Sequence, residues 1–512
     1  MTTPVPTTPM PGRDACLRAL HARDARFDGR FYVGVLTTGV FCRPVCSARE
    51  PRAENCLFFP SAAAALSAGF RPCLRCRPEL APGTAGWRGT ANTVSRAIDL
   101  IAEGAWGDGD DVEALAERVG VGGRHLRRLF ERHVGASPVA VVQAQRLLFA
   151  KRLLAETAMP MAEVALASGF GSVRRFNHVV SRTFGRPPRA LRRAAGGAAP
   201  PASGVVLRLA FTRPYHWPSM LAFLAHRAIP GVEVSSVERG EYRRAISVDG
   251  ASGSVRVRLA ADGSHLAAAI DVSGLAALPA VVGRIRRFFD LDADAAAIDA
   301  QLAKDPLLAR RIAARPGLRV PGAWDPFELA VRAILGQQIS VAAARTLAGR
   351  IASLCGERVV AAEDGGGFGL VFPGPERLAE APLETIGLTR ARAAAVKALA
   401  RAAADDPVLL RPAGDLGATV ARLVELPGVG RWTAQYIAMR AFREPDAFPE
   451  ADLGLLRALE RDGVRPSPAE LLRRSERWRP WRAYAALHLW TGAPEPAVTS
   501  NPGGKRRGRT AA

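Results

Sequence analysis

Two cysteine-containing stretches decide the fold of the N-terminal part of this chain: Phe41-Cys42-Arg43-Pro44-Val45-Cys46 and Arg71-Pro72-Cys73-Leu74-Arg75-Cys76-Arg77. In each stretch only two or three residues separate the two cysteines. Two such pairs, joined by a folded spacer, can supply four thiolates to one tetrahedral zinc ion. We therefore expect Cys42, Cys46, Cys73 and Cys76 to bind zinc. The spacing alone favours a purely structural site, and only the neighbouring residues point to a reactive one.

Those neighbours, Gly39 to Cys46 and Ala68 to Cys76, resemble the N-terminal domain of the Ada family of regulators of DNA alkylation repair. The resemblance implies that Cys42 is both a zinc ligand and the acceptor of a methyl group from DNA. The zinc ion would then be structural and catalytic, and the methyl acceptor would act once per molecule.

The charge of such a cluster is consistent with this chemistry. Four thiolates on one dication carry a formal charge near −2, which repels an ordinary phosphodiester but lets a neutral methylphosphotriester approach. Methyl transfer to Cys42 removes one negative charge from a surface that faces DNA, so we expect it to tighten DNA binding. Four arginines near the cysteines are suited to holding flanking phosphates, although each is also typical of a solvated surface. They are Arg43, Arg71, Arg75 and Arg77.

Composition indicates a polyanionic partner. The 512 residues carry a formal net charge of +22 and a pI near 11.0, as expected of a chain that binds nucleic acid. The remaining cysteines, Cys16, Cys56 and Cys355, suggest no disulfide framework, and we interpret Cys56 as a core residue. With no signal peptide and no apolar run of about 18 residues, we expect a cytoplasmic, nucleoid-associated protein without a membrane segment.

A helical segment between residues 83 and 195 contains two similar units. Residues 111–119 and 124–133 read as helix, turn and helix, and residues 161–167 and 172–184 repeat the pattern. Ser137-Pro138 opens a long connecting helix through Leu154. Two such units joined by one helix resemble the DNA-binding domain of AraC-type regulators.

The charge of this segment supports DNA reading. Residues 121–195 contain fourteen Lys or Arg and three Glu, a net charge of +11. We expect residues 124–132 and 172–182 to be recognition helices in successive major grooves. Arg127 and Arg128 fit phosphate contacts as well as base contacts. The candidate DNA contacts are Arg124, His125, Arg127, Arg174, Arg175, Asn177 and His178.

The second chemistry begins at Leu426-Pro427-Gly428-Val429-Gly430, which predicts a tight hairpin between two helices. The backbone N–H groups at Gly428 and Gly430 can face a phosphate, although this pattern alone is typical of an ordinary turn. Together with residues 324–340, 448–452 and 478–490, it resembles the helix-hairpin-helix DNA glycosylases. Residues 205–493 as a whole resemble 3-methyladenine DNA glycosylase II of the AlkA type.

That resemblance implies hydrolytic excision of N-alkylated purines such as 3-methyladenine, with Asp452 stabilising an oxocarbenium-like sugar. A helix N-cap is the alternative interpretation of Asp452. The base must leave the helix, and an electron-rich pocket would favour a cationic purine. We expect Trp432, Tyr436, Trp490 and Phe223 to form this pocket, although each is also typical of a core.

Three further expectations follow. The resemblance implies that Gln337 and Gln338 contact DNA. Gln338 stands where the best-known relative inserts a leucine wedge into the gap left by the flipped base, and a glutamine can still fill this gap. No lysine lies between Lys397 and Lys505, so a Schiff-base lyase step is not expected and the glycosylase is monofunctional. The hairpin can bind a monovalent cation beside DNA.

The expected fold is multidomain and mainly α, with a small α+β zinc domain, a tandem helix-turn-helix, an α+β subdomain and a helix-hairpin-helix glycosylase. We expect a disordered tail (1–12), a zinc methyl-acceptor domain (13–82), a DNA-binding domain (83–195) and a linker (196–204). An α+β subdomain (205–285), the glycosylase domain (286–495) and a basic tail (496–512) follow.

The expected partners are double-stranded DNA and RNA polymerase, and the expected state is a monomer. The two alternatives are a regulator whose glycosylase-like half only binds DNA, and a repair enzyme whose front half only localises it.

Overall fold

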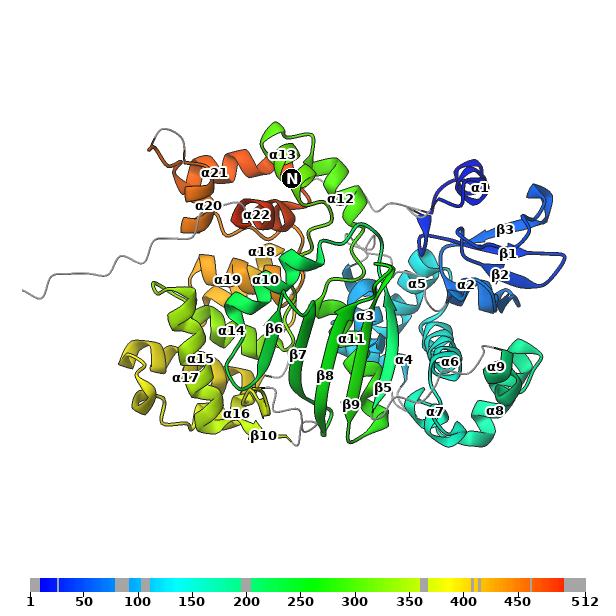
Figure 1. The fold of residues 1–512 in the computed structure, drawn as a ribbon, viewed down its shortest axis with the longest axis horizontal. Helices are drawn as coiled ribbons and strands as arrows, with labels where there is room; N and C mark the ends of the chain where they lie inside the picture. Colours follow the sequence, from blue (N-terminus) through cyan, green and yellow to red (C-terminus); the bar gives the residue numbers. More distant parts are fainter. Residues whose placement is uncertain are drawn as a thin grey trace, which may run out of the picture.

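The computed structural model describes residues 10–24, 27–78, 92–102, 111–194, 204–359, 367–406, 409–412, 416–460 and 463–491. The expected disordered residues 1–9, the linker residues 196–203 and the basic tail lie outside them. Figure 1 shows the cysteine-containing part at one side, next to the connecting helices of the DNA-binding part. A five-stranded sheet stands at the centre, and the C-terminal helices lie on the side opposite the cysteines.

The N-terminal part is a four-stranded sheet with two helices. Its elements are α1 (Arg13–His21), β1 (Tyr32–Val35), β2 (Val40–Cys42), β3 (Cys56–Phe59), α2 (Ala62–Ser67) and β4 (Arg71–Pro72). The strand order is β3-β1-β2-β4, and β2 and β4 run parallel with Phe41 opposite Pro72. Both strands end immediately before or at a cysteine, so their carboxyl ends deliver Cys42 and Cys73 to the same edge of the sheet.

Seven helices form the expected DNA-binding part: α3 (Asn92–Ala102), α4 (Val112–Arg118), α5 (Gly123–Val134), α6 (Pro138–Glu156), α7 (Met161–Ala167), α8 (Val173–Phe184) and α9 (Pro188–Ala194). Asp111, Ser137 and Ser172 cap α4, α6 and α8 through their side-chain oxygens. Each accepts an N–H that would otherwise be unsatisfied at the helix start. The expected helices are therefore confirmed to within one or two residues.

Residues 205–272 form an antiparallel sheet of order β5-β9-β8-β7-β6. Its strands are β5 (Val205–Ala210), β6 (Glu233–Ser236), β7 (Glu241–Val248), β8 (Ala251–Leu259) and β9 (His265–Val272). Helix α10 (Trp217–Arg227) follows β5, and α11 (Leu278–Phe288) follows β9. The boundary expected at residues 285 and 286 falls inside α11, because the apolar face of this helix belongs to the core of the sheet.

The remaining described helices follow α11 in the chain. They are α12 (Ala295–Leu302), α13 (Pro306–Ala314), α14 (Pro326–Leu335), α15 (Val341–Cys355), α16 (Pro375–Ala379), α17 (Arg390–Asp405), α18 (Leu416–Val424), α19 (Arg431–Arg440), α20 (Leu453–Ala458), α21 (Pro468–Ser475) and α22 (Arg482–Trp490). A two-stranded sheet of β10 (Glu357–Arg358) and β11 (Leu370–Val371) interrupts this nearly helical region.

Helix α6 joins two hydrophobic cores. Val141 and Val142 belong to a cluster with α3 to α5, whereas Leu147 and Leu153 belong to a large cluster that continues into the five-stranded sheet. The helix also packs against α2 of the cysteine-containing part. None of the described helices is long and apolar enough to span a bilayer.

Candidate metal centre, DNA-reading helices and base pocket

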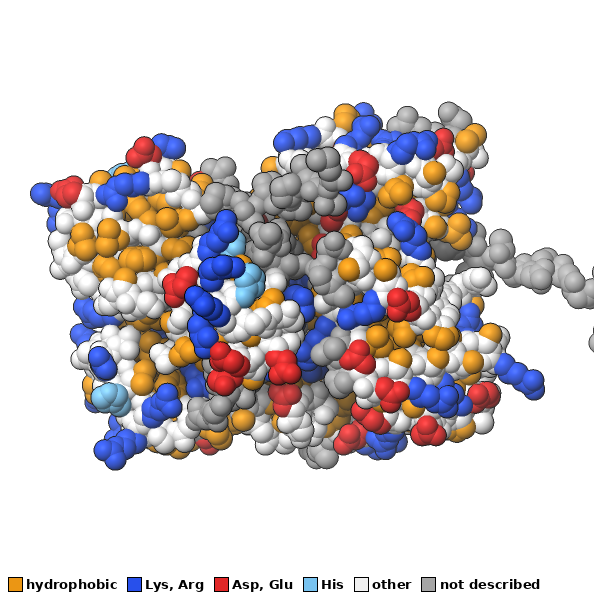
Figure 2. Space-filling view, turned by 180° about the vertical axis from the view of Figure 1, so that it is seen from behind, with side chains coloured by type: hydrophobic (Ala, Val, Ile, Leu, Met, Phe, Trp, Pro, Cys, Tyr) orange, Lys and Arg blue, Asp and Glu red, His pale blue; other side chains and the backbone are white. Residues whose placement is uncertain are grey.

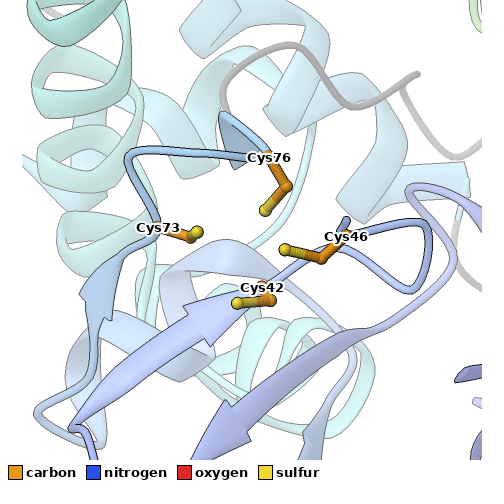
Figure 3. Close-up of side chains that lie close together, drawn as sticks. All are labelled: Cys42, Cys46, Cys73 and Cys76. Atoms are coloured by element: carbon orange, nitrogen blue, oxygen red, sulfur yellow. The ribbon is translucent and has the colours of Figure 1, made fainter. Parts of the chain in front are cut away.

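Four cysteine side chains converge at one edge of the N-terminal sheet (Figure 3). The sulfur atoms of Cys42, Cys46, Cys73 and Cys76 all lie within 4.8 Å of one another. Zinc–sulfur bonds of about 2.3 Å in a tetrahedron place sulfurs a little under 4 Å apart, so the cluster fits one zinc ion. The backbone N–H of Arg43 donates to the Sγ of Cys76 at 3.3 Å, as is favourable for a thiolate. Cys56 is fully buried in a separate core cluster with Cys16, so the interpretation of Cys56 as core is confirmed.

Arg43, expected on the DNA-facing surface, is turned inward instead. Its guanidinium forms an ion pair with Asp28, which is 8% exposed, through Nε at 2.8 Å and also through Nη2. Nη1 donates to the Cys76 carbonyl at 3.1 Å. The side chain therefore ties the loop after Cys42 to the loop that carries Cys76. Arg71 and Arg75 are exposed, as a phosphate contact requires.

Two contacts connect the cysteine cluster with α6. The ammonium of Lys151, which is buried, donates to the Cys73 carbonyl at 2.9 Å. Arg77, next to Cys76, donates to the buried carboxylate of Glu156 at 3.0 Å. Glu156 also accepts from Arg152 at 3.3 Å and from the backbone N–H of Arg208 in β5 at 3.0 Å. This carboxylate therefore contacts all three parts of the chain.

We expect Glu156→Gln to destabilise the assembled chain, because it leaves the guanidiniums of Arg77 and Arg152 without their shared counter-ion. Breaking a buried ion pair typically costs about 3–5 kcal/mol, so the melting temperature falls by several degrees. Scanning calorimetry of the wild type and the variant measures this change. Glu131→Gln, on the exposed side of α5, is the matched control and should change the free energy of unfolding by less than about 0.5 kcal/mol. Equal melting temperatures for the two variants would contradict the role of Glu156.

The candidate DNA contacts of the two helix-turn-helix units are all exposed. Arg124, His125 and Arg127 lie on α5, where the Arg127 guanidinium pairs with Glu113 of α4 at 3.0 Å. Arg174, Arg175, Asn177 and His178 lie on α8. The opposite faces of both helices are buried through Leu126, Phe130, Phe176 and Val180. Figure 2 shows a file of Lys or Arg side chains, with His beside it, on the face seen from behind.

The hairpin between α18 and α19 requires a glycine at position 428. Gly428 has φ +79, and a Cβ there would lie 2.5 Å from the Cβ of Ala395, so only glycine fits. Gly430 is the extended N-cap of α19. Gln337, expected to contact DNA, donates its side-chain amide to the Gly428 carbonyl at 2.8 Å and to Thr433 Oγ1 at 2.9 Å. Gln337 therefore braces the hairpin, whereas its neighbour Gln338 is exposed in a left-handed conformation with φ +58.

The carboxylate of Asp452 makes the hydrogen bonds of a helix N-cap and also contacts two of the expected pocket residues. Its Oδ1 accepts the backbone N–H of Leu455 at 3.0 Å, which makes it the N-cap of α20. Oδ1 also accepts the indole N–H of Trp490 at 2.8 Å, and Oδ2 accepts that of Trp432 at 3.0 Å. Two neutral indole donors hold the carboxylate in place, and no cation among the described residues forms an ion pair with it. The same side chain thus caps α20 and places a carboxylate beside Trp432 and Trp490.

The predicted pocket aromatics lie together. The rings of Trp432 and Tyr436 stack at 5.4 Å with an 8° interplanar angle, and Trp490 lies edge-on to Tyr436 at 6.3 Å. Phe223 of α10 contacts two arginines. The guanidinium carbons of Arg227 and Arg440 lie 3.8 and 4.8 Å from its ring centroid. Sequence reasoning did not find these two arginines, because no spacing rule brings α10 next to α19.

Four family models match consecutive parts of the chain. The model of the metal binding domain of Ada matches residues 15–79, and a helix-turn-helix domain model matches residues 115–194. The AlkA N-terminal domain model matches residues 206–325. The model of the HhH-GPD superfamily of base excision DNA repair proteins matches residues 331–483. The order of the matches agrees with the order of the expected parts.

Three relatives cover different shares of the chain. The DNA-3-methyladenine glycosylase 2 of Escherichia coli is 37% identical over 289 residues, which are 54% of this chain and 94% of that protein. The bifunctional transcriptional activator/DNA repair enzyme Ada of E. coli is 35% identical over 33% of this chain and 46% of its own length. The probable bifunctional transcriptional activator/DNA repair enzyme AlkA of Mycobacterium tuberculosis is 41% identical over 94% of this chain and 97% of that protein. Because this last similarity extends over nearly the whole of both proteins, the chain belongs to the family of AlkA-type bifunctional transcriptional activators and DNA repair enzymes.

Proposed function

We propose that the protein senses and repairs alkylated DNA with two separate sites, a methyl acceptor at Cys42 and a base-excision pocket at Asp452. The observation that carries the second site is the carboxylate of Asp452 held by the indoles of Trp432 and Trp490, both of which contact the ring of Tyr436. In this proposal the zinc domain, the DNA-reading helices and the glycosylase follow one another along the chain.

Base excision begins with a purine that alkylation has already made positively charged. Such a base is a good leaving group, so the enzyme must chiefly stabilise the positive charge that develops on the sugar. Asp452 supplies the negative charge, Gln338 fills the gap left by the flipped nucleotide, and Gly428 and Gly430 present backbone N–H groups to a phosphate. No described lysine lies near the pocket, and we propose a monofunctional glycosylase that leaves an abasic site.

The sensor half works through charge. Cys42, Cys46, Cys73 and Cys76 would hold the zinc ion, which when bound would keep their sulfurs deprotonated at neutral pH. The Cys42 sulfur attacks the methyl carbon of a methylphosphotriester and becomes a neutral thioether, while the methyl C–O bond breaks and leaves an ordinary phosphodiester anion in the DNA. Arg71 and Arg75 hold the neighbouring phosphates, while Arg43 and Asp28 fix the loops that carry Cys42 and Cys76. The lost negative charge strengthens DNA binding by α5 and α8, which then present the protein to RNA polymerase at promoters.

Three further features belong to this proposal. The hairpin binds a monovalent cation beside DNA, the protein acts as a monomer, and it associates with the nucleoid through its excess of arginine.

Release of 3-methyladenine from alkylated duplex DNA tests the repair half, with chromatography of the freed base as the readout. We expect release by the intact, zinc-loaded protein. If the folded protein bound this DNA but released no base, residues 205–493 would be a binding module of a pure regulator. Activation of a reporter gene after methylation tests the sensor half separately.

A further inference from the structure

A buried arginine stands behind the pocket aromatics. Arg440 is the last residue of α19, and its side chain is only 4% exposed. Its guanidinium donates to the carbonyls of Pro321 and Gly322, the latter at 3.1 Å, and to the hydroxyl oxygen of Tyr436 at 2.7 Å. All three acceptors are uncharged. A cation placed here would be expected to oppose the binding of a positively charged base.

Neighbouring charges do not compensate Arg440. The nearby carboxylates of Glu233 and Glu328 are engaged by Arg332, at 2.9 and 3.1 Å, and by Arg244. Two acids are thus matched by two arginines. Arg440 and Arg227 line the same small cavity, together with the carboxylate of Asp325, which caps α14. One positive charge therefore remains in excess.

The protonation of the pair follows from its surroundings. Burial lowers the pKa of Arg440 to about 10, which leaves it charged at neutral pH. Burial raises the pKa of Tyr436, but the guanidiniums of Arg440, Arg227 and Arg332 outweigh this effect, and the net shift is downward. The positive field therefore reaches the phenol ring that forms the pocket wall.

Arg440 and Asp452 lie at the two ends of one aromatic pair. Asp452 accepts from the indole of Trp432, Trp432 stacks on Tyr436, and Tyr436 accepts from Arg440. The electrostatic potential across this wall consequently runs from positive at Arg440 to negative at Asp452.

We propose that Arg440 is a positioning residue whose charge accelerates base excision by favouring movement of positive charge from the base to the sugar. The inference rests on the proposed function of the Asp452 pocket. When the glycosidic C1′–N bond breaks, its electron pair goes to the base, which becomes neutral, and the positive charge appears on C1′ and O4′. Water then adds to C1′ and loses a proton. The cation thus moves away from Arg440 and towards Asp452, so the pair stabilises the transition state more than the bound substrate.

Single-turnover kinetics with Arg440→Gln test this inference, because the amide can still donate to the freed carbonyls but carries no charge. On DNA with 3-methyladenine we expect the maximal rate to fall on the order of tenfold, while the half-saturating enzyme concentration stays equal or decreases. Hypoxanthine is a neutral base that leaves as an anion. On DNA with hypoxanthine, the maximal rate of Arg440→Gln should fall, and its half-saturating enzyme concentration should not decrease. Arg440→Lys, which retains a charge, should recover most of the maximal rate at pH 6.

Arg319→Met is the matched control. Arg319 is also buried, donates to the carbonyls of Asp290 and Ala293 at 2.6 and 2.9 Å, and lies over the rings of Phe211 and Tyr215, away from Asp452. The Arg319→Met variant should lose thermal stability as Arg440→Gln does, but it should keep the wild-type maximal rate of base release. Equal losses of rate in Arg319→Met and Arg440→Gln would overturn the inference, as would an Arg440→Lys enzyme as slow as Arg440→Gln.

Arg440→Lys keeps the test decisive if Arg440→Gln does not fold. Burial lowers the pKa of a lysine, so its charge is lost as the pH rises, whereas the wild-type arginine remains charged. The rate of the lysine variant relative to wild type should therefore fall between pH 6 and 9, and a constant ratio would contradict the proposal. The other groups that face this position are Arg227, Glu233, Asp325, Glu328, Arg332 and Tyr436. Failure of the wild type to release any base would instead refute the proposed function.

Discussion

Asp452→Asn should lower the rate of 3-methyladenine release on the order of 10²–10³-fold, the usual effect of removing one preorganised electrostatic contact to a transition state. The neutral amide no longer stabilises the positive charge that develops on the sugar. Its oxygen still caps α20 and accepts from Trp490, so the fold is retained. Single-turnover release under saturating enzyme measures the change, and circular dichroism confirms the fold.

The amide also loses one hydrogen bond, and this loss needs its own control. Asparagine turns an N–H group towards the indole N–H of Trp432, whereas Asp452 accepts from it at 3.0 Å. Trp432→Phe removes the same hydrogen bond but keeps the carboxylate. If the two variants lost activity equally, the effect of Asp452→Asn would be one of geometry, and the carboxylate would not be the group that stabilises the sugar.

Cys42→Ala should abolish methyl transfer from methylphosphotriester DNA while leaving base release unchanged. The variant lacks the accepting thiolate and one zinc ligand, and a structural zinc contributes roughly 10–16 kcal/mol in small zinc domains. We therefore also expect a lower zinc content and a less stable N-terminal part. Base release is retained because Phe41, next to Cys42, belongs to a different hydrophobic cluster from those against which Trp490 and Tyr436 pack. Transfer of a labelled methyl group and metal analysis measure the two effects.

Cys56→Ala separates the acceptor from the other buried cysteines of this domain. Cys56 lies outside the cluster of four sulfurs and packs with Cys16 and Phe31. This variant should keep its zinc and its methyl transfer, and lose only stability. Peptide mapping of the methylated wild type should find the methyl group on Cys42. A methyl group on Cys46, Cys73 or Cys76 would assign the acceptor to a different ligand.

Local chemistry made much of this protein predictable. Two closely spaced cysteine pairs indicate one metal site whatever the path of the chain between them, and the structure brings the four sulfurs together. The caps at Asp111, Ser137 and Ser172 act within three residues of sequence, so the helix starts were correctly predicted. The positive φ of Gly428 follows equally from the hairpin sequence.

Contacts between distant residues decided the rest. The order of the five-stranded sheet, the position of α11 across the expected boundary and the inward turn of Arg43 towards Asp28 depend on packing that no local pattern encodes. Gln337 illustrates the same limit, because its partner Gly428 lies 91 residues away.

The sequence by itself determined which chemical groups this protein has: four thiolates, two basic recognition helices, a glycine hairpin and one carboxylate with three aromatic neighbours. Only the tertiary structure decided their electrostatic setting. Arg440 reaches the pocket because α14 packs against α19, and its carbonyl partners lie 118 and 119 residues away in the chain. The field at a site depends on every charge that folding brings near it, and sequence separation does not report that distance.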